Sequence, residues 1–134
     1  MALFGKFGDY KNFGLLIIRI GLGIMFILHG YPKLLGGPHK WEEIGSATTY
    51  VGIRFWPLFW GFMAAVTEAI GGVLLIIGWQ FRLVCLLMVI NLIVAAVLTY
   101  NTGGINDASH AIEDAVVFAG LLFLGPGKYS ADKK

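Results

Sequence analysis

Ionisable side chains interrupt the hydrophobic stretches of this 134-residue chain at only a few positions. Arg19 lies inside the run "LLIIRIGLGIMFIL", and Glu68 lies inside "VTEAIGGVLLIIG". A charge at the centre of a bilayer costs about 2.5–3.5 kcal/mol on insertion scales, so each should face other helices and have a partner. A buried carboxylate can exchange protons, and an arginine can donate hydrogen bonds to a ligand. These two residues are therefore the first candidates for a functional site.

Further polar residues are predicted to lie toward the opposite end of the hydrophobic segments. His29 comes near the end of the first segment, Lys33 follows it, and His110 and Asp114 are one helical turn apart in the last segment. We expect these four side chains to form a second cluster. The predicted roles are proton transfer for Glu68 and Asp114, and ligand binding for Arg19, His29, Lys33, Glu68 and His110.

Arg19 is predicted to pair with an internal carboxylate, and Glu68 is the preferred partner. In antiparallel helices with a rise of 1.5 Å per residue, a guanidinium reaching up from Arg19 meets Glu68 more easily than Asp114. Two interpretations of this pair stay open: it can serve a ligand, or it can only fix the packing of the helices. Asn91, in the third hydrophobic segment, is expected to hydrogen-bond between helices.

The composition indicates that these residues are surrounded by a membrane. Hydrophobic residues make up 57% of the chain and charged residues 13%, which does not suit the polar surface of a soluble domain. Roughly 20 mostly apolar residues cross a bilayer as a helix, and the sequence predicts such helices at 13–31, 57–79, 81–100 and 108–125. The expected fold is a single all-α domain over 1–134, a membrane four-helix bundle with up-down-up-down topology.

The predicted connections differ in length. An outer loop, 32–56, joins the first two helices, and Trp41, Ile44, Thr48 and Val51 within it have roughly helical spacing. Either a short interfacial helix or an irregular loop is compatible with this pattern. The second and third helices are joined through "WQFR", which predicts a tight antiparallel hairpin.

Positive charges predict the orientation in the membrane. With four spans both termini lie on one side, and cytoplasmic loops carry an excess of Lys and Arg. The sequence therefore predicts a multi-pass protein with both termini in the cytoplasm. Six cations fall with the termini and the second turn, against three in the other loops: Lys6, Lys11, Arg82, Lys128, Lys133 and Lys134 against Lys33, Lys40 and Arg54.

Several kinds of site are disfavoured. Cys85 is the single cysteine, so one chain cannot build a thiol pair, an iron–sulfur centre or a cysteine-based zinc site, and no metal site is predicted. A haem with two histidine ligands would need His29 and His110, and neither lies well inside an apolar helix. No glycine-rich phosphate loop indicates a nucleotide. The net charge of +2, placed mostly at helix ends, does not indicate nucleic acid.

Three motifs in this order resemble the DoxX family of small four-helix membrane proteins: "RIGLGIMFILHGYPKL" (19–34), "EAIGGVLLIIGWQFRLVCLLM" (68–88) and "GPGKYSAD" (125–132). The resemblance implies a protein of the bacterial cytoplasmic (inner) membrane. In some relatives it implies a subunit of a thiosulfate:quinone oxidoreductase or of an oxidoreductase complex in oxidative-stress defence. It places the family's helix-1 arginine and lysine on Arg19 and Lys33, and its helix-2 glutamate on Glu68.

Two functions from different classes are compatible with these observations. In the first, the chain is a quinone-linked oxidoreductase subunit, with quinone as the suspected cofactor and electrons from a redox partner protein or a reduced small molecule. In the second, it is a non-enzymatic membrane anchor or assembly factor, or a small carrier. A four-helix carrier would need a homo-oligomer to enclose a pathway. The lipid bilayer is a partner in both.

Overall fold

The computed structural model describes residues 3–133, and within that range the chain folds into helices joined by turns and bends, with no strand. The predicted all-α class is therefore confirmed. Four long helices are accompanied by one short α-helix and two short 3-10 helices. In chain order they are η1 (Gly5–Tyr10), α1 (Lys11–Leu35), α2 (Gly37–Gly45), η2 (Ser46–Val51), α3 (Pro57–Ile77), α4 (Phe81–Gly103) and α5 (Ile105–Leu124).

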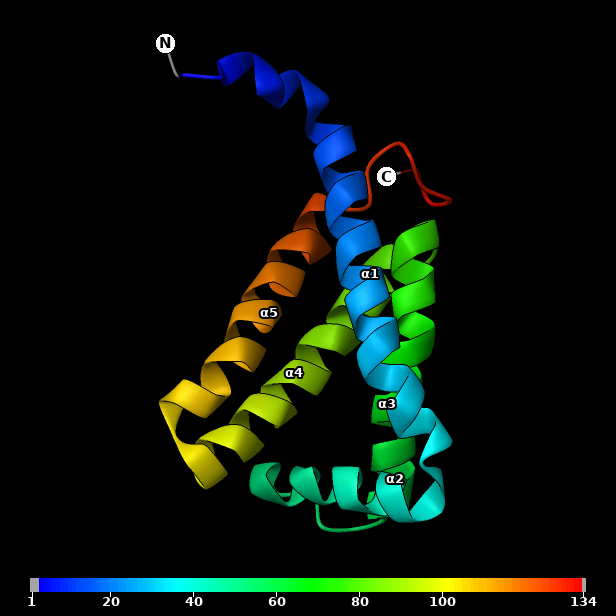
Figure 1. The fold of residues 1–134 in the computed structure, drawn as a ribbon, viewed down its shortest axis with the longest axis vertical. Helices are drawn as coiled ribbons and strands as arrows, with labels where there is room; N and C mark the ends of the chain where they lie inside the picture. Colours follow the sequence, from blue (N-terminus) through cyan, green and yellow to red (C-terminus); the bar gives the residue numbers. More distant parts are fainter. Residues whose placement is uncertain (1–2, 134) are drawn as a thin grey trace.

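The long helices alternate in direction, as the up-down-up-down prediction requires. Helix α1 packs against α3 and α4 packs against α5, whereas α3 and α4 diverge from the short turn that joins them (Figure 1). Helix α2 lies across the end of the bundle away from both chain ends (Figure 1). We call this the α2 end and the opposite one the terminal end. The chain thus forms two antiparallel helix pairs that open toward the α2 end.

The charges divide between these two ends as the sequence predicts. Lys33, Lys40 and Arg54 belong to the segments at the α2 end. The Lys and Arg residues that were assigned to the side of the termini lie in segments at the terminal end, except Lys134, which lies outside the described residues. The cations at the terminal end are Lys6, Lys11, Arg82, Lys128 and Lys133.

Helix α1 is longer than the predicted 13–31, because it continues through Pro32 to Leu35. Proline lacks the N–H that would bond to the carbonyl four residues earlier, but its fixed φ is compatible with a helix. The extension has a consequence for the site. It keeps Lys33 in the helix, one turn beyond Gly30 and on the same face.

The predicted outer loop contains ordered helices. Of the two alternatives for this segment, the short helix is present: it begins at Gly37, with Pro38 in its first turn, and becomes a 3-10 helix after Gly45. Trp41 is half-buried, and its ring meets the Phe62 ring of α3 at a centroid distance of 4.8 Å. An edge-to-face aromatic pair of this kind fixes α2 against α3.

Three segments within residues 3–133 are long and apolar enough to cross a membrane: Gly5–Leu35, Pro57–Ile77 and Phe81–Gly103. Helix α5 is not among them, because Asp107, Glu113 and Asp114 interrupt its first half. It packs along α4. A helix within a bundle can carry polar residues that would be costly on a lone helix in lipid. The prediction that 108–125 spans the membrane stays a prediction.

Small residues set the distances between helices. A side chain at Gly23 would collide with the carbonyl oxygen of Gly72, and one at Gly61 would collide with the carbonyl oxygen of Trp41. Backbones approach this closely only where side chains are absent, which is how membrane helices gain packing contacts. Farther from the glycines, the rings of Phe26 on α1 and Phe118 on α5 pack edge-to-face at 5.3 Å and connect the two helix pairs.

The C-terminal segment folds back over the terminal end of the bundle. The Asp132 carboxylate accepts the backbone N–H groups of Gln80 (3.1 Å) and Phe81 (2.8 Å) at the start of α4. The backbone N–H of Lys128 donates to the Asn12 side chain at 3.0 Å. A carboxylate at a helix N-terminus satisfies N–H groups that have no partner within the helix. The tail therefore joins α1 and α4 as well as ending the chain.

The α2–α3 contact gives a test of this packing. The Gly61→Ala variant is expected to lower the free energy of unfolding by about 1–3 kcal/mol, because the added methyl group overlaps backbone that cannot move alone. Thermal unfolding in detergent micelles, followed by circular dichroism, measures the change. Gly120→Ala is the matched control: its added methyl group would meet no neighbouring element within 4 Å, and alanine suits a helix better than glycine. Equal stability of the two variants would contradict the close contact.

Candidate functional site

Arg19 is fully buried and binds backbone carbonyls, not a carboxylate. Its Nη1 donates to Ile76 O at 2.9 Å and to Leu75 O at 3.3 Å, and its Nη2 donates to Tyr129 O. The first two carbonyls belong to the last turn of α3, where a helix has no backbone donors of its own. A cation there also interacts favourably with the helix dipole. Arg19 thus caps α3 and holds the C-terminal tail.

The predicted Arg19–Glu68 pair is wrong, and helix register explains why. Gly30, not Arg19, packs beside Glu68: a side chain at Gly30 would lie 2.7 Å from Glu68 Cβ. Arg19 is separated from Gly30 by about 16 Å along α1 at 1.5 Å per residue, which exceeds the reach of one side chain. Among residues 3–133, no carboxylate forms an ion pair with Arg19.

Arg82 repeats the role of Arg19 at the neighbouring helix end. From the first turn of α4, its Nε donates to Leu122 O in the last turn of α5 at 3.0 Å. Both arginines therefore satisfy C-terminal carbonyls at the terminal end of the bundle. Arg19 thus contributes to the framework of the fold, and its predicted role in ligand binding stays a prediction.

Glu68 pairs with Lys33, and Asn91 completes the cluster. Lys33 Nζ lies 3.0 Å from Oε1 and 2.9 Å from Oε2 of Glu68, while Asn91 Nδ2 donates to Oε1 at 3.2 Å. The Glu68 side chain is 10% exposed and that of Lys33 35% exposed. We call these three residues the polar triad. It joins α1, α3 and α4 at the depth where α3 and α4 separate.

Local structure holds Lys33 in this position. Because α1 continues through Pro32, the Lys33 side chain projects from the same face of the helix as Gly30. Gly30 packs directly against the backbone of Ala69. The indole N–H of Trp41 donates to Lys33 O at 3.1 Å and ties this turn to α2. The ammonium can therefore turn back along α1 and meet Glu68.

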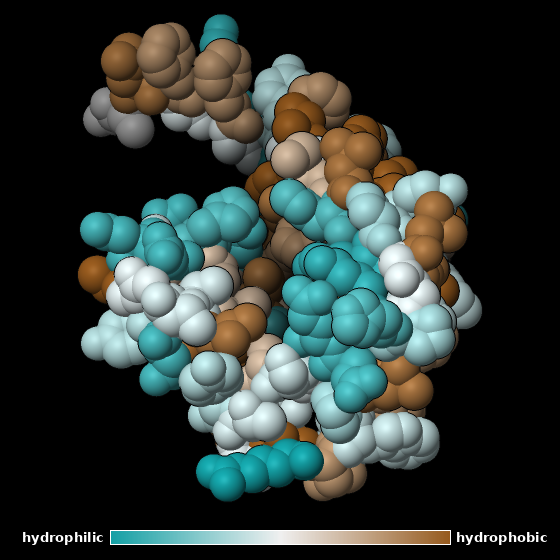
Figure 2. Space-filling view, turned by 60° about the horizontal axis from the view of Figure 1, so that its bottom comes forward, coloured by the Kyte–Doolittle hydropathy of each residue, from teal (hydrophilic) through white to brown (hydrophobic). Residues whose placement is uncertain are grey.

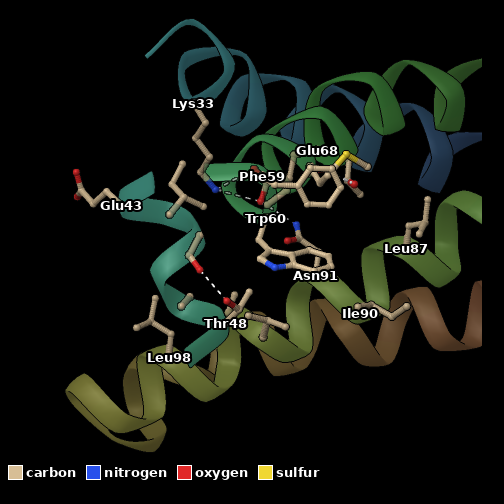
Figure 3. A pocket seen from close by; sticks show the side chains of 18 residues that line it. Lys33, Glu43, Thr48, Phe59, Trp60, Glu68, Leu87, Ile90, Asn91 and Leu98 are labelled. Carbon is tan, nitrogen blue, oxygen red and sulfur yellow. Dashed lines mark hydrogen bonds and ion pairs between the residues drawn. The ribbon is translucent and has the colours of Figure 1, made fainter. Parts of the chain in front are cut away.

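A cavity of roughly 630 Å³ opens beside the polar triad, between α2 with η2 on one side and α3 and α4 on the other (Figure 3). Its walls are mostly apolar, and the rings of Phe59 and Trp60 contribute from α3. Ligand sites commonly combine such a volume and apolar lining with a few polar groups. Its other apolar and small lining residues are Ile44, Gly45, Ala47, Met63, Ala64, Leu87, Ile90, Val94, Ala95 and Leu98.

Few polar groups line this cavity besides the triad. Glu43 of α2 stands at its rim and points away from Lys33 (Figure 3). The Thr67 hydroxyl donates to Met63 O at 2.7 Å, so its proton is already engaged. Lys33 and Asn91, by contrast, each retain an N–H beyond those bonded to Glu68, since an ammonium has three donors and an amide nitrogen two. These N–H groups are available to a ligand.

The α2 end is hydrophilic at its surface. Figure 2 shows hydrophilic side chains gathered over this end, with hydrophobic surface visible in the hollow between them. The exposed faces of α1 include Ile17, Ile24 and Leu28, as expected for a surface in contact with lipid. A compound with an apolar body and a polar head would match both surroundings.

The predicted second cluster is only partly assembled. His110 Nε2 and Asp114 Oδ2 lie 3.4 Å apart, but the His110 side chain is 78% exposed. Lys33 is not part of this cluster, because its ammonium binds Glu68. His29 is exposed, and its ring packs beside that of Phe26, one turn earlier on α1. Within residues 3–133, no group of three His, Cys, Asp or Glu side chains is placed to hold a metal ion.

Sequence reasoning missed the choice of partners, although a signal was present. The buried positions Arg19, Gly23, Phe26 and Gly30 alternate in steps of four and three, and the next step of three reaches Lys33. The same alternation on α3 passes through Glu68: Gly61, Ala65, Glu68, Gly72 and Leu75. Had α1 been extended beyond Pro32, this stripe would have placed Lys33 on the face that meets α3. No comparable periodicity in the sequence indicated that Phe59 and Trp60 line the cavity.

Comparisons with known proteins cover most of this chain. The model of the DoxX family matches residues 14–101, a range that includes the whole polar triad. The Bacillus subtilis (strain 168) protein named "Putative oxidoreductase CatD" is 34% identical over 84 residues, which are 63% of this chain and 58% of that protein. The chain thus spans little more than half of its length. No solved structure matches this chain.

A second relative is covered more completely. "Uncharacterized membrane protein Rv3486" of Mycobacterium tuberculosis is 28% identical over an alignment of 136 residues, which includes 87% of this chain and 78% of that protein. Its name describes a membrane protein, in keeping with the three apolar segments found here.

A double-mutant cycle tests the assignment of partners. Lys33→Met and Glu68→Gln should be coupled by roughly 0.5–3 kcal/mol in the free energy of unfolding, because they share direct hydrogen bonds. Arg19→Met and Glu68→Gln should be additive to within about 0.5 kcal/mol, because they lie in different networks. Chemical unfolding in mixed micelles measures both. Strong coupling of Arg19 to Glu68 would restore the pair that the sequence predicted.

Proposed function

This chain belongs to the DoxX family of membrane proteins, and on that premise we propose that it is an oxidoreductase subunit that binds a quinone in the cavity beside the polar triad. The observation that carries the proposal is the position of Lys33, Glu68 and Asn91. These residues place hydrogen-bond donors and a carboxylate at the wall of a mostly apolar cavity. The name of the Bacillus relative, an oxidoreductase, supports the class of function.

The residues present fit a quinone. A ring with carbonyl groups needs donors at its oxygens and apolar or aromatic surface at its faces, and an isoprenoid tail needs an apolar exit. Lys33 and Asn91 offer the free N–H groups, and Phe59 and Trp60 offer aromatic surface. Leu87 and Ile90 line the cavity while being partly exposed on α4, which provides an apolar way out toward lipid.

Chemically, the chain's own residues would orient the ring and handle protons. Lys33 and Asn91 would hold a carbonyl oxygen by hydrogen bonds, and Glu68 would accept or supply a proton at the adjacent site. A bound quinone supplies the redox chemistry, accepting an electron pair and a pair of protons to become a quinol. A redox partner protein or a reduced small molecule would supply the electrons. The proposal assigns proton transfer to Glu68, and the roles of Asp114, His29 and His110 stay predictions.

The proposal includes a location and an orientation. We place the chain in the bacterial cytoplasmic membrane with both termini in the cytoplasm. The cations gathered at the terminal end support this placement, since cytoplasmic segments carry an excess of Lys and Arg. The cavity would then lie in the outer half of the membrane, and quinone would reach it from that leaflet.

Quinone binding to the purified protein tests the proposal. Titration of a short-chain quinone, followed by quenching of tryptophan fluorescence, should saturate with the wild type. The Asn91→Leu variant should bind roughly tenfold more weakly, because it loses a half-buried hydrogen-bond donor at the cavity wall. Asn101→Leu, on the same helix at an exposed position, is the control and should bind normally. Absence of saturable binding to the wild type would overturn the quinone proposal and favour the anchor or carrier function.

Cysteine labelling tests the orientation. Cys85 is fully buried, so the native background is expected to be low. His39 at the α2 end and Asp9 at the terminal end are exposed, so cysteines can be introduced there as His39→Cys and Asp9→Cys. In spheroplasts, a membrane-impermeant maleimide should label His39→Cys at once and Asp9→Cys only after permeabilisation. The reverse pattern would invert the proposed orientation.

A further inference from the structure

We propose that Glu68 sets the charge selectivity of the cavity: by occupying Lys33, it makes the site accept uncharged carbonyl compounds and reject oxyanions such as sulfate and thiosulfate. This inference rests on the proposed function only in treating the cavity as a ligand site. It assigns to Glu68 a role in specificity in addition to proton transfer.

The positive charge at the cavity wall is already paired with a negative one. Within the described part of the chain, Lys33 is the single cation among the residues that line it, and both oxygens of Glu68 hold its ammonium, at 2.9 and 3.0 Å. A buried anion needs a compensating positive charge, since desolvation of an unpaired ion is costly. Because Glu68 already supplies the negative partner, the cavity offers an incoming anion no net positive charge. Glu43 at the rim adds a further negative charge.

Most side-chain hydrogen-bond donors that line the cavity are already bonded to backbone carbonyls. The Thr48 hydroxyl lies 2.9 Å from Gly45 O and 2.9 Å from Ile53 O, and the Trp60 indole donates to Phe55 O at 3.0 Å. Thr67 is engaged in the same way with the backbone of its own helix. A tetrahedral oxyanion needs several donors on different sides, whereas a carbonyl oxygen needs only one or two. The remaining N–H groups of Lys33 and Asn91 are enough for a carbonyl and too few for an oxyanion.

Removal of the Glu68 charge should therefore reverse the selectivity. In Glu68→Gln, the Lys33 ammonium keeps its place in the wall but loses its counter-charge. The Gln carboxamide keeps the shape of the side chain without its charge, so an oxyanion in the cavity can bind the Lys33 ammonium directly. The variant is expected to gain an anion site that the wild type lacks.

Isothermal titration calorimetry of the full chain in neutral detergent tests this with sodium sulfate and sodium thiosulfate at constant ionic strength. The wild type should show no saturable binding. Glu68→Gln should show saturable binding, with an affinity at least about tenfold above the upper limit measured for the wild type, because one like charge near the anion is removed. The Lys33→Met, Glu68→Gln double variant should lose this gain. Glu113→Gln, at an exposed position of α5, is the matched control and should bind no better than the wild type.

The outcomes separate this inference from the proposed function. Saturable binding of sulfate or thiosulfate to the wild type overturns the inference without any variant, and so does a gain that persists after Lys33→Met. Glu68→Ala removes the same charge and replaces Glu68→Gln if that variant does not fold. Failure of the wild type to bind quinone, together with an anion gain in Glu68→Gln, overturns the quinone proposal and supports the charge selectivity.

Discussion

The need to pair buried polar groups within the chain governs this structure, because the hydrocarbon of a membrane offers them no hydrogen-bond partners. Arg19 and Lys33 solve this problem in different ways on the same helix. Arg19 serves the carbonyls at the end of α3 and in the C-terminal tail, while Lys33 serves a carboxylate in the middle of α3. The two cations fix α1 against α3 at two levels, the end and the middle of α3, and the glycines between them let the backbones meet.

The two ends of the bundle consequently have different properties. At the terminal end, arginines and the folded tail satisfy the helix termini, and fully buried side chains such as Phe81 and Cys85 fill the space between helices. Toward the α2 end, α3 and α4 separate, and the space between them is a cavity instead of a core. The triad lies at the boundary between the closed part and the open part. This position lets the same residues contribute to packing and remain accessible to a ligand.

The Lys33–Glu68 ion pair is only partly buried and lies beside the cavity. Replacing an ion pair by apolar residues of similar volume often leaves stability unchanged or raises it. A contribution to stability is therefore a weak explanation for the presence of this pair. Its placement beside a mostly apolar cavity, with Asn91 as a third member and N–H groups left over, is the basis of the proposed ligand site. The DoxX family match includes all three residues.

The amino-acid sequence was enough to predict the membrane class, the approximate extent of the long helices and the inward position of Arg19, Glu68 and Asn91, although not that His29 and His110 are exposed. These properties depend on local hydropathy and on helical periodicity, which neighbouring residues specify. The packing of the helices was needed to show that Glu68 pairs with Lys33 and Asn91, that Arg19 binds backbone carbonyls, and that the tail returns to cap α4. Partner choice depends on the register between helices that are distant in sequence, on the continuation of α1 through Pro32 and on the return of the C-terminal segment. A shift of a few ångströms along a helix axis changes which side chains meet, and hydropathy carries no record of that shift.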